Sequence, residues 1–489
     1  MRVAIIGSGF GGLAAGIRLL AQGHRVTILE KLDQPGGRAA TFTQDGFTFD
    51  AGPTIITAPW LLHELFGLGG GAIDDYVRLV PLDPFYNVRF GDGSVFRYSG
   101  SHDEILRQVR AFSPGDVSGY EAFARHTEAI FRTGFALIDA PFLRLGDMLR
   151  VAPDLVRLQS WRSVAGYVNR FIRDERLRQV FSFHPLLVGG NPFQTTSIYA
   201  LIHHLEKTWG VWFAMGGTGA LVRGLARRFA DLGGELRLNT EVAEIEVQSR
   251  RATGVRLADG EIVQADAVVS NGDVAATYLH LVPAHARTHH TDARVRRRRY
   301  SMSLVVIYFG TNRRYDHLAH HEILMGPRYR GLLDDVFVNR RLSPDFSLYL
   351  HRPTATDPSL APPGCDAWYV LSPVPHLGAD IDWANAGPAY RDAIMQHLEA
   401  HWLPDLSRHL VTERRIEPTY FRDALNSHLG SAFSLEPILT QSAWFRPHNR
   451  SEDIPNLYFA GAGTHPGAGI PGVLSSGKIV ADLIGRADA

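Results

Sequence analysis

The sequence is poor in several features that define whole classes of proteins. It contains one cysteine, Cys365, so no internal disulfide can form, and a reducing, cytoplasmic location is expected. It has no uncharged apolar run of about 18 residues or more, so we expect no membrane-spanning helix. Its 50 basic and 50 acidic residues cancel, which removes the electrostatic steering typical of nucleic-acid binding. We therefore expect no nucleic-acid partner.

What remains is the composition of a large folded protein. Hydrophobic residues make up 45% of the chain and charged residues 20%, which is ordinary for a globular protein. Hydrophobic cores stop growing near ~250–300 residues. The 489 residues therefore predict at least two domains.

The first thirty residues carry a glycine motif between two apolar runs. Residues 3–6 (Val-Ala-Ile-Ile) predict a strand buried on both faces, and residues 13–21 predict a helix. Between them the pattern G-x-G-x-x-G falls on Gly7, Gly9 and Gly12. These glycines permit a tight turn, a close approach of backbone to a diphosphate, and close packing of helix on strand, while the helix N-terminus attracts the phosphates.

A second predicted strand, residues 25–30, ends in the carboxylate of Glu30. Glu30 follows Gly12 by 18 residues, where an acidic side chain can accept hydrogen bonds from a ribose diol. Strand, glycines, helix, strand and terminal glutamate together predict a dinucleotide site. The motif alone does not distinguish FAD from NAD.

The segment Gln-Pro-Gly-Gly-Arg at residues 34–38 favours FAD. Here the chain resembles the large flavoprotein family that includes amine oxidases, carotenoid desaturases and Rab GDP-dissociation inhibitors. The resemblance implies that Gly37 and Arg38 lie along FAD, with the Arg38 guanidinium near its phosphates. It also implies that Val242 contacts the adenine end through its backbone, although a plain core valine is the alternative.

A second glycine-rich segment closes the chain. Residues 456–461 predict a strand, and residues 461–472 form a loop that includes Gly461, Gly463 and Gly472 before a helix from about Val473. The N-terminus of such a helix can stabilise the negative charge of a reduced flavin. In the wider family an acidic residue often follows this strand, and here that place holds Ala462.

The two motifs lie at opposite ends of the chain, so both ends must meet in one domain. We expect an α/β fold with a discontinuous Rossmann-type FAD-binding domain, residues 1–70, 210–290 and 425–489. Residues 71–209 and 291–424 are expected to form an α+β domain that binds substrate and associates with the membrane.

Four further segments narrow the resemblance to bacterial-type phytoene desaturases: residues 47–54, 181–193, 209–213 and 439–449. The resemblance implies FAD-dependent desaturation of phytoene, a C40 hydrocarbon, in four steps to lycopene, with oxygen or a quinone as electron acceptor. Alternatives are a diapophytoene desaturase, a hydroxycarotenoid 3,4-desaturase, a carotenoid ketolase, or a non-enzymatic binder related to the GDP-dissociation inhibitors.

Three residues in matching segments are candidates for catalysis: Asp147, Arg150 and His184. Asp147 and Arg150 would lie at i and i+3 of a helix, where they can pair. They can equally cap and pair on a surface helix, and a flavin dehydrogenation of this kind can proceed without a strong base.

Two middle regions carry charge. Residues 141–178 contain eight arginines and four acids among apolar residues, which is typical either of an interfacial helix or of a solvated helix over the core. Residues 313–345 are rich in His, Arg and Asp without periodicity and are interpreted as a long loop. Their histidines, His317, His320 and His321, lack the carboxylate or cysteine spacing of a metal site, so none is expected.

Overall fold

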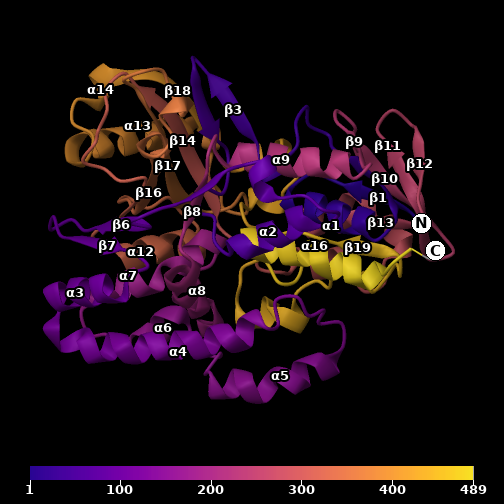
Figure 1. Cartoon of the computed structure of the whole chain (residues 1–489), viewed down its shortest axis with the longest axis horizontal. Coiled ribbons are helices and arrows are strands. Elements are labelled where there is room, and N and C mark those ends of the chain that lie inside the picture. Colours follow the sequence, from indigo (N-terminus) through magenta and orange to yellow (C-terminus); the bar gives the residue numbers. More distant parts are fainter. Residues whose placement is uncertain (488–489) are drawn as a thin grey trace.

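A parallel five-stranded sheet joins the beginning, the middle and the end of the chain in the computed structural model, which describes residues 1–487. Its order is β19–β13–β1–β2–β9, formed by β19 (Leu457–Phe459), β13 (Ala267–Ser270), β1 (Arg2–Ile6), β2 (Arg25–Leu29) and β9 (Glu235–Arg237). The first and the last of the described residues lie beside this sheet (Figure 1). The mixed α/β fold with a parallel sheet is therefore confirmed.

Helices α1 (Phe10–Ala21), α9 (Thr218–Asp231) and α16 (Ile470–Ile484) pack together against this sheet. Glycines permit the close approach. A Cβ on Gly16 would lie 2.7 Å from Phe229 Cε2, and one on Gly477 would lie 2.8 Å from the Ala15 backbone nitrogen. A small three-stranded sheet, β10 (Val242–Gln248), β11 (Arg251–Leu257) and β12 (Ile262–Gln264), lies beside β13.

A seven-stranded sheet builds the other half of the molecule in the order β18–β14–β17–β16–β15–β6–β7. Its strands are β18 (Leu410–Ile416), β14 (Ser303–Thr311), β17 (Asp366–Val374), β16 (Leu348–His351), β15 (His321–Leu324), β6 (Tyr86–Arg89) and β7 (Val95–Tyr98). All of its pairs are antiparallel except β15 with β6. Helix α13 (Trp383–His401) covers one face, packing on alternate residues of β14, and the opposite face turns toward the rest of the core.

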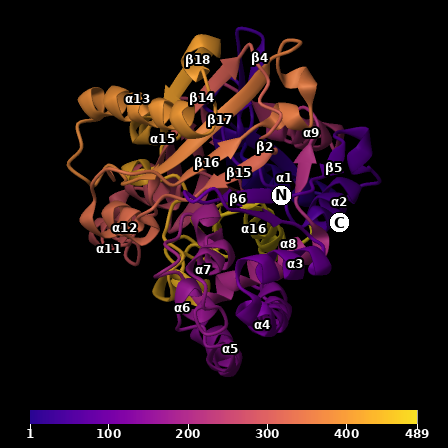
Figure 2. The ribbon, with the colours of Figure 1, turned by 90° about the vertical axis from the view of Figure 1, so that its left-hand side faces the viewer.

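Helices α3 (His102–Phe112), α4 (Val117–Phe135), α5 (Leu145–Arg157) and α8 (Leu201–Trp209) form a layer below both sheets in Figure 1. Helix α5 lies at the outer edge of this layer in both views (Figures 1 and 2). No helix within residues 1–487 is long and apolar enough to cross a membrane.

The interpretation of residues 313–345 as a long loop is wrong. The segment contains β15, helix α12 (Tyr329–Asp334) and a helical turn at Asp335–Asn339. All four residues of β15 are buried, so no polar–apolar alternation marks it. Its Glu322 is neutralised by Arg89, whose Nε lies 2.6 Å from Glu322 Oε2.

Candidate functional site

A single cavity of about 1210 Å³ is lined by residues of both large sheets and of helices α5 and α8. Ordinary small-molecule sites occupy about 300–1,000 Å³. One part of the wall is the glycine-rich loops from the two ends of the chain; the rest is mostly aliphatic and aromatic. The site can therefore hold a dinucleotide together with a large apolar ligand.

The first glycine motif forms the turn between β1 and α1. Gly7, at φ +91°, turns the chain after β1, and Gly7 and Gly9 border the cavity. Gly12 does not border the cavity, because it lies against the turn: a Cβ there would be 2.2 Å from the Gly7 carbonyl oxygen. The helix N-terminus behind Gly9 has no side-chain cap, which leaves backbone N–H groups for an anion.

Glu30 directly follows β2, and hydrogen bonds fix its carboxylate. Its carboxylate accepts hydrogen bonds from the Ser8 backbone N–H (2.9 Å), the Ser8 hydroxyl (2.8 Å) and the Leu32 N–H (3.0 Å). It borders the cavity, as does Val242 at the start of β10. These contacts fix the carboxylate and leave lone pairs for a ribose diol.

Gly37 and Arg38 also border the cavity, in a short helical turn after β2. Arg38 Nη2 donates to Ser427 Oγ at 2.6 Å, and within residues 1–487 its Nε has no partner. Burial lowers the pKa of Arg38, with the charge of Asp273 opposing the shift. A partly buried guanidinium with an unused donor fits an anionic group such as a phosphate.

The C-terminal loop supplies Gly461, Gly472 and Val473 to the wall, together with Ala462 at the usual acidic place. Gly463 lies behind it, where a Cβ would be 2.8 Å from Val274 Cγ2. Helix α16 begins directly after the loop and has no side-chain cap at Gly469.

Arg446, which the sequence did not single out, braces this loop from behind. It is 2% exposed and donates to the backbone oxygens of Thr464 (2.9 Å) and Ala462 (2.6 Å). A buried arginine that contacts carbonyl groups fixes loop backbone, so the loop is pre-organised.

Residues 10–485 match the model of the flavin containing amine oxidoreductase family. The chain belongs to this family. It is 54% identical to a lycopene-forming phytoene desaturase of Pseudescherichia vulneris over 99% of each chain, and 52% identical to one of Pantoea ananas over 98% of each chain. Among solved structures, cyclohexylamine oxidase from Brevibacterium oxydans superposes with a TM-score of 0.63 at 17% identity, covering 99% of this chain and 98% of its own, which indicates a shared fold.

Family membership and these relatives confirm both the predicted resemblance and the predicted cofactor, FAD. The residues that line the cavity are suited to bind FAD. Uncapped helix N-termini and Arg38 suit its phosphates, Glu30 suits its ribose, and the end motifs border one cavity.

The predicted catalytic pair lies elsewhere. Asp147 Oδ2 accepts from the Arg144 backbone N–H at 2.9 Å, which caps α5, and Arg150 is 80% exposed with its Nη2 3.8 Å from Asp147 Oδ1. Neither borders the cavity; Met148, Val151 and Leu155 of the same helix do. The geometry favours the capping alternative, and the catalytic role stays an untested prediction.

His184 is buried just outside the cavity wall. Its Nε2 lies 3.2 Å from Oε2 of Glu206, a fully buried carboxylate that borders the cavity and also accepts from the Tyr86 hydroxyl. His184 therefore faces a carboxylate and not the cavity. Sequence reasoning missed Glu206 because nothing local distinguishes a glutamate on α8 that points inward.

A second cluster of polar side chains lies in the apolar part of the cavity wall. Tyr349 Oη lies 2.7 Å from Thr54 Oγ1 and 2.6 Å from His321 Nδ1, and Thr54 Oγ1 lies 3.0 Å from Tyr369 Oη. Thr54, Tyr349 and Tyr369 border the cavity. His321 lies behind them.

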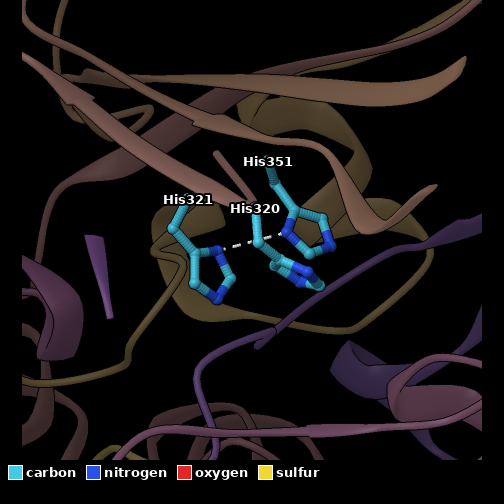
Figure 3. A group of neighbouring side chains, drawn as sticks. All are labelled: His320, His321 and His351. Atoms are coloured by element: carbon cyan, nitrogen blue, oxygen red, sulfur yellow. Dashed lines mark hydrogen bonds between the residues drawn. The ribbon is translucent and has the colours of Figure 1, made fainter. Parts of the chain in front are cut away.

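His321 is one of three buried histidines that converge, with His320 and His351 (Figure 3). His321 Nδ1 and His351 Nδ1 are 3.2 Å apart, and His320 Nδ1 is 2.6 Å from Thr356 Oγ1. Burial lowers the pKa of His320 to about 3 and those of His321 and His351 well below their usual value, so all three are neutral. One nitrogen of each ring lies close enough to the others for shared metal ligation, as do atoms of His289, His290 and Glu452.

Proposed function

We propose that this chain is an FAD-dependent phytoene desaturase that forms lycopene in four steps during carotenoid biosynthesis. The observation that carries the proposal is the large apolar cavity, which is continuous with both glycine loops of the flavin site. The relatives that are more than 50% identical over nearly the whole chain support this substrate and product.

Bound FAD would take up the hydride removed from an allylic carbon. The protein itself binds the cofactor, orients the substrate and shields both from water. Arg38 and the N-terminus of α1 hold phosphates, Glu30 holds a ribose, and the N-terminus of α16 stabilises negative charge on the reduced cofactor. The apolar wall aligns the polyene and excludes water.

The proposal includes the site residues inferred from the sequence. We assign Gly7, Gly9, Gly12, Glu30 and Gly37 to the cofactor, with the further set Arg38, Val242, Gly461, Gly463, Gly472 and Val473. We also propose the two-part division of the chain, with an FAD-binding part formed by residues 1–70, 210–290 and 425–489 and a substrate-binding part formed by the remainder.

Peripheral membrane contact is proposed through α5. One face of this helix lines the cavity, while Leu145, Leu149 and Val156 are 53%, 65% and 61% exposed, and Trp161 just beyond it is 58% exposed. Arg150 and Arg157 flank them. Exposed apolar residues with arginines suit the interface of an anionic membrane, where the substrate is dissolved.

This contact is tested by flotation with liposomes containing anionic lipid. Leu149→Asp should reduce the bound fraction severalfold, whereas Val411→Asp, a charge at another exposed apolar residue (49%), should leave it unchanged. Equal loss in both variants would contradict the assignment.

The catalytic proposal is tested by incubating the holoprotein with phytoene in liposomes and analysing pigments by chromatography. We expect lycopene with oxygen or a quinone as acceptor, and flavin bleaching when both are withheld. A C30 substrate and hydroxylated or keto carotenoids are assayed in parallel. Turnover of those alone would favour a diapophytoene desaturase, a 3,4-desaturase or a ketolase. Failure to bind any flavin would favour a binding protein.

A further inference from the structure

We infer that Tyr349 and His321 together accept the proton that leaves the substrate in each desaturation step. The inference rests on the proposed function and goes beyond it, since it assigns the proton to named atoms. When a hydride leaves one allylic carbon for the bound flavin, which is thereby reduced, the substrate becomes a cation and its neighbouring carbon must lose a proton.

Several groups that can accept a proton line the cavity, among them Glu206 and His465, and the hydrogen bonds of the phenols single out one tyrosine. Tyr308 Oη donates to the Ala51 backbone oxygen, and Tyr329 Oη has no partner within residues 1–487 to receive a proton. Among the described residues that line the cavity, Tyr349 is the one whose hydroxyl is bonded to a histidine ring nitrogen. Its side chain also borders the cavity.

The hydrogen bonds around Tyr349 can run in one direction. Tyr369 donates to Thr54, Thr54 donates to Tyr349, and Tyr349 donates to His321 Nδ1, at 3.0, 2.7 and 2.6 Å. In this arrangement the Tyr349 oxygen keeps a lone pair for the cavity, and His321 carries its own hydrogen on Nε2.

The carbon–hydrogen bond breaks, and its electron pair forms the new double bond. The proton joins the Tyr349 oxygen as the original Tyr349 proton moves to His321 Nδ1, which leaves a neutral tyrosine and an imidazolium. His351 Nδ1, 3.2 Å from His321 Nδ1, can share that proton.

The weak basicity of these buried groups is not an obstacle. Burial keeps the Tyr349 phenol protonated by raising its pKa, and it lowers the pKa of His321. A carbon next to a carbocation is strongly acidic, so a neutral imidazole is a sufficient acceptor. A weakly basic imidazole also releases the proton readily afterwards, which four successive steps require.

The test compares Tyr349→Phe and His321→Gln with wild type, using phytoene deuterated at the carbon that loses the proton or at the carbon that loses the hydride. We expect kcat to fall about 10²-fold with KM within twofold, as for loss of a general base. The isotope effect should move to the proton-losing carbon, because its cleavage becomes rate-limiting. A merely structural role would not shift the isotope effect.

The matched control is Tyr390→Phe, which removes a buried phenol bonded to Ser372 Oγ at 2.8 Å outside the cavity and should leave both values unchanged. Flavin content and thermal melting are measured for every variant, and His321→Gln decides if Tyr349→Phe does not fold.

The inference would be overturned if folded Tyr349→Phe and His321→Gln kept the wild-type kcat and isotope pattern. It would also be overturned if Glu206→Gln alone caused a large loss of kcat. Stoichiometric metal on the three histidines would overturn it too, since ligation would occupy the accepting nitrogen. Absence of any product from wild type would instead overturn the proposed function.

Discussion

The flavin end and the substrate end of the cavity are built by different means. The flavin end is made of backbone: tight glycines, uncapped helix N-termini, and one carboxylate and one guanidinium held beside them. The substrate end is made of side chains from separate strands and helices, such as Val151, Glu206 and Tyr349. Its polar groups are few and lie among aromatic rings.

Specificity for the cofactor and specificity for the hydrocarbon therefore have different structural origins. A phosphate needs N–H groups at fixed positions, which only a particular backbone can supply. A hydrocarbon needs volume and exclusion of water, which many residue combinations provide. The two ends should therefore respond differently to substitution, and each variant below tests that expectation.

The largest effect is expected at Gly12. Gly12→Val would place a Cβ only 2.2 Å from the Gly7 carbonyl oxygen, and a backbone atom in a packed turn cannot shift without cost. We expect loss of bound flavin and a markedly lower melting temperature. Gly146→Ala is the control, because a Cβ there meets nothing within 4 Å and alanine favours the helix. Normal flavin content in Gly12→Val would show that the turn tolerates a side chain.

A charge on the cavity face of α5 should impair the substrate end of the cavity and leave the flavin end intact. Val151 is 8% exposed and borders the cavity, whereas Val156 on the same helix is 61% exposed. Val151→Arg would put an unpaired cation against the hydrocarbon, so turnover should fall at least 10²-fold while flavin stays bound. Val156→Arg should keep near-normal turnover in detergent. If both variants lose flavin, the ends are coupled and the comparison fails.

The same contrast explains what could be predicted from sequence. Gly7, Gly9, Gly12 and Glu30 act within one βαβ unit, so their spacing alone predicts their arrangement. Gly7, Gly9 and Glu30 border one cavity with the C-terminal loop, and Gly12 lies behind the turn.

Tyr349 and His321 could not be predicted in this way. They lie on neighbouring strands whose register pairs His321 with His351, and β15 is buried throughout, so no alternation reveals it. Nor can a sequence tell which face of α5 turns inward. Asp147 and Arg150 matched a family segment, yet the helix turns Met148 and Val151 to the cavity.

Asp50, next to Ala51 of the cavity wall, offers a pH test. Its carboxylate accepts from the Thr218 and Gly219 backbone N–H groups, at 2.9 and 3.1 Å, and burial raises its pKa to about 6. A raised folded-state value means that the folded protein binds this proton more tightly, so Asp50 adds stability as the pH falls from about 6 toward 4.

The rise from 3.8 to about 6 corresponds to about 3 kcal/mol. We expect the melting temperature of wild type to increase relative to that of Asp50→Asn as the pH is lowered through this range. Asp103→Asn, at an exposed carboxylate, provides the reference. A wild-type minus Asp50→Asn difference that stays constant with pH would contradict the assignment.

A smaller effect is expected at Glu30. Glu30→Gln keeps the shape but replaces one anionic acceptor with an amide, so FAD should bind about 10-fold more weakly, on the scale of one lost charged hydrogen bond. Titration of apoprotein with FAD, followed by fluorescence, measures this. Glu261→Gln, at an exposed carboxylate paired with Arg237, is the matched control. Saturating FAD should restore turnover in Glu30→Gln, because this end of the cavity holds the cofactor without touching the hydrocarbon.

The smallest effect is expected at Asp147 and Arg150. Asp147→Asn retains a capping oxygen for the Arg144 N–H, and Arg150→Ala removes a side chain that is 80% exposed. If α5 acts only as a wall, both variants should turn over phytoene within about twofold of wild type, since an exposed pair contributes little. Assays in detergent keep membrane binding out of the measurement. A 10²-fold loss of kcat in either variant, with flavin bound, would restore catalysis to this pair and would mean that α5 turns its other face to the cavity during the reaction.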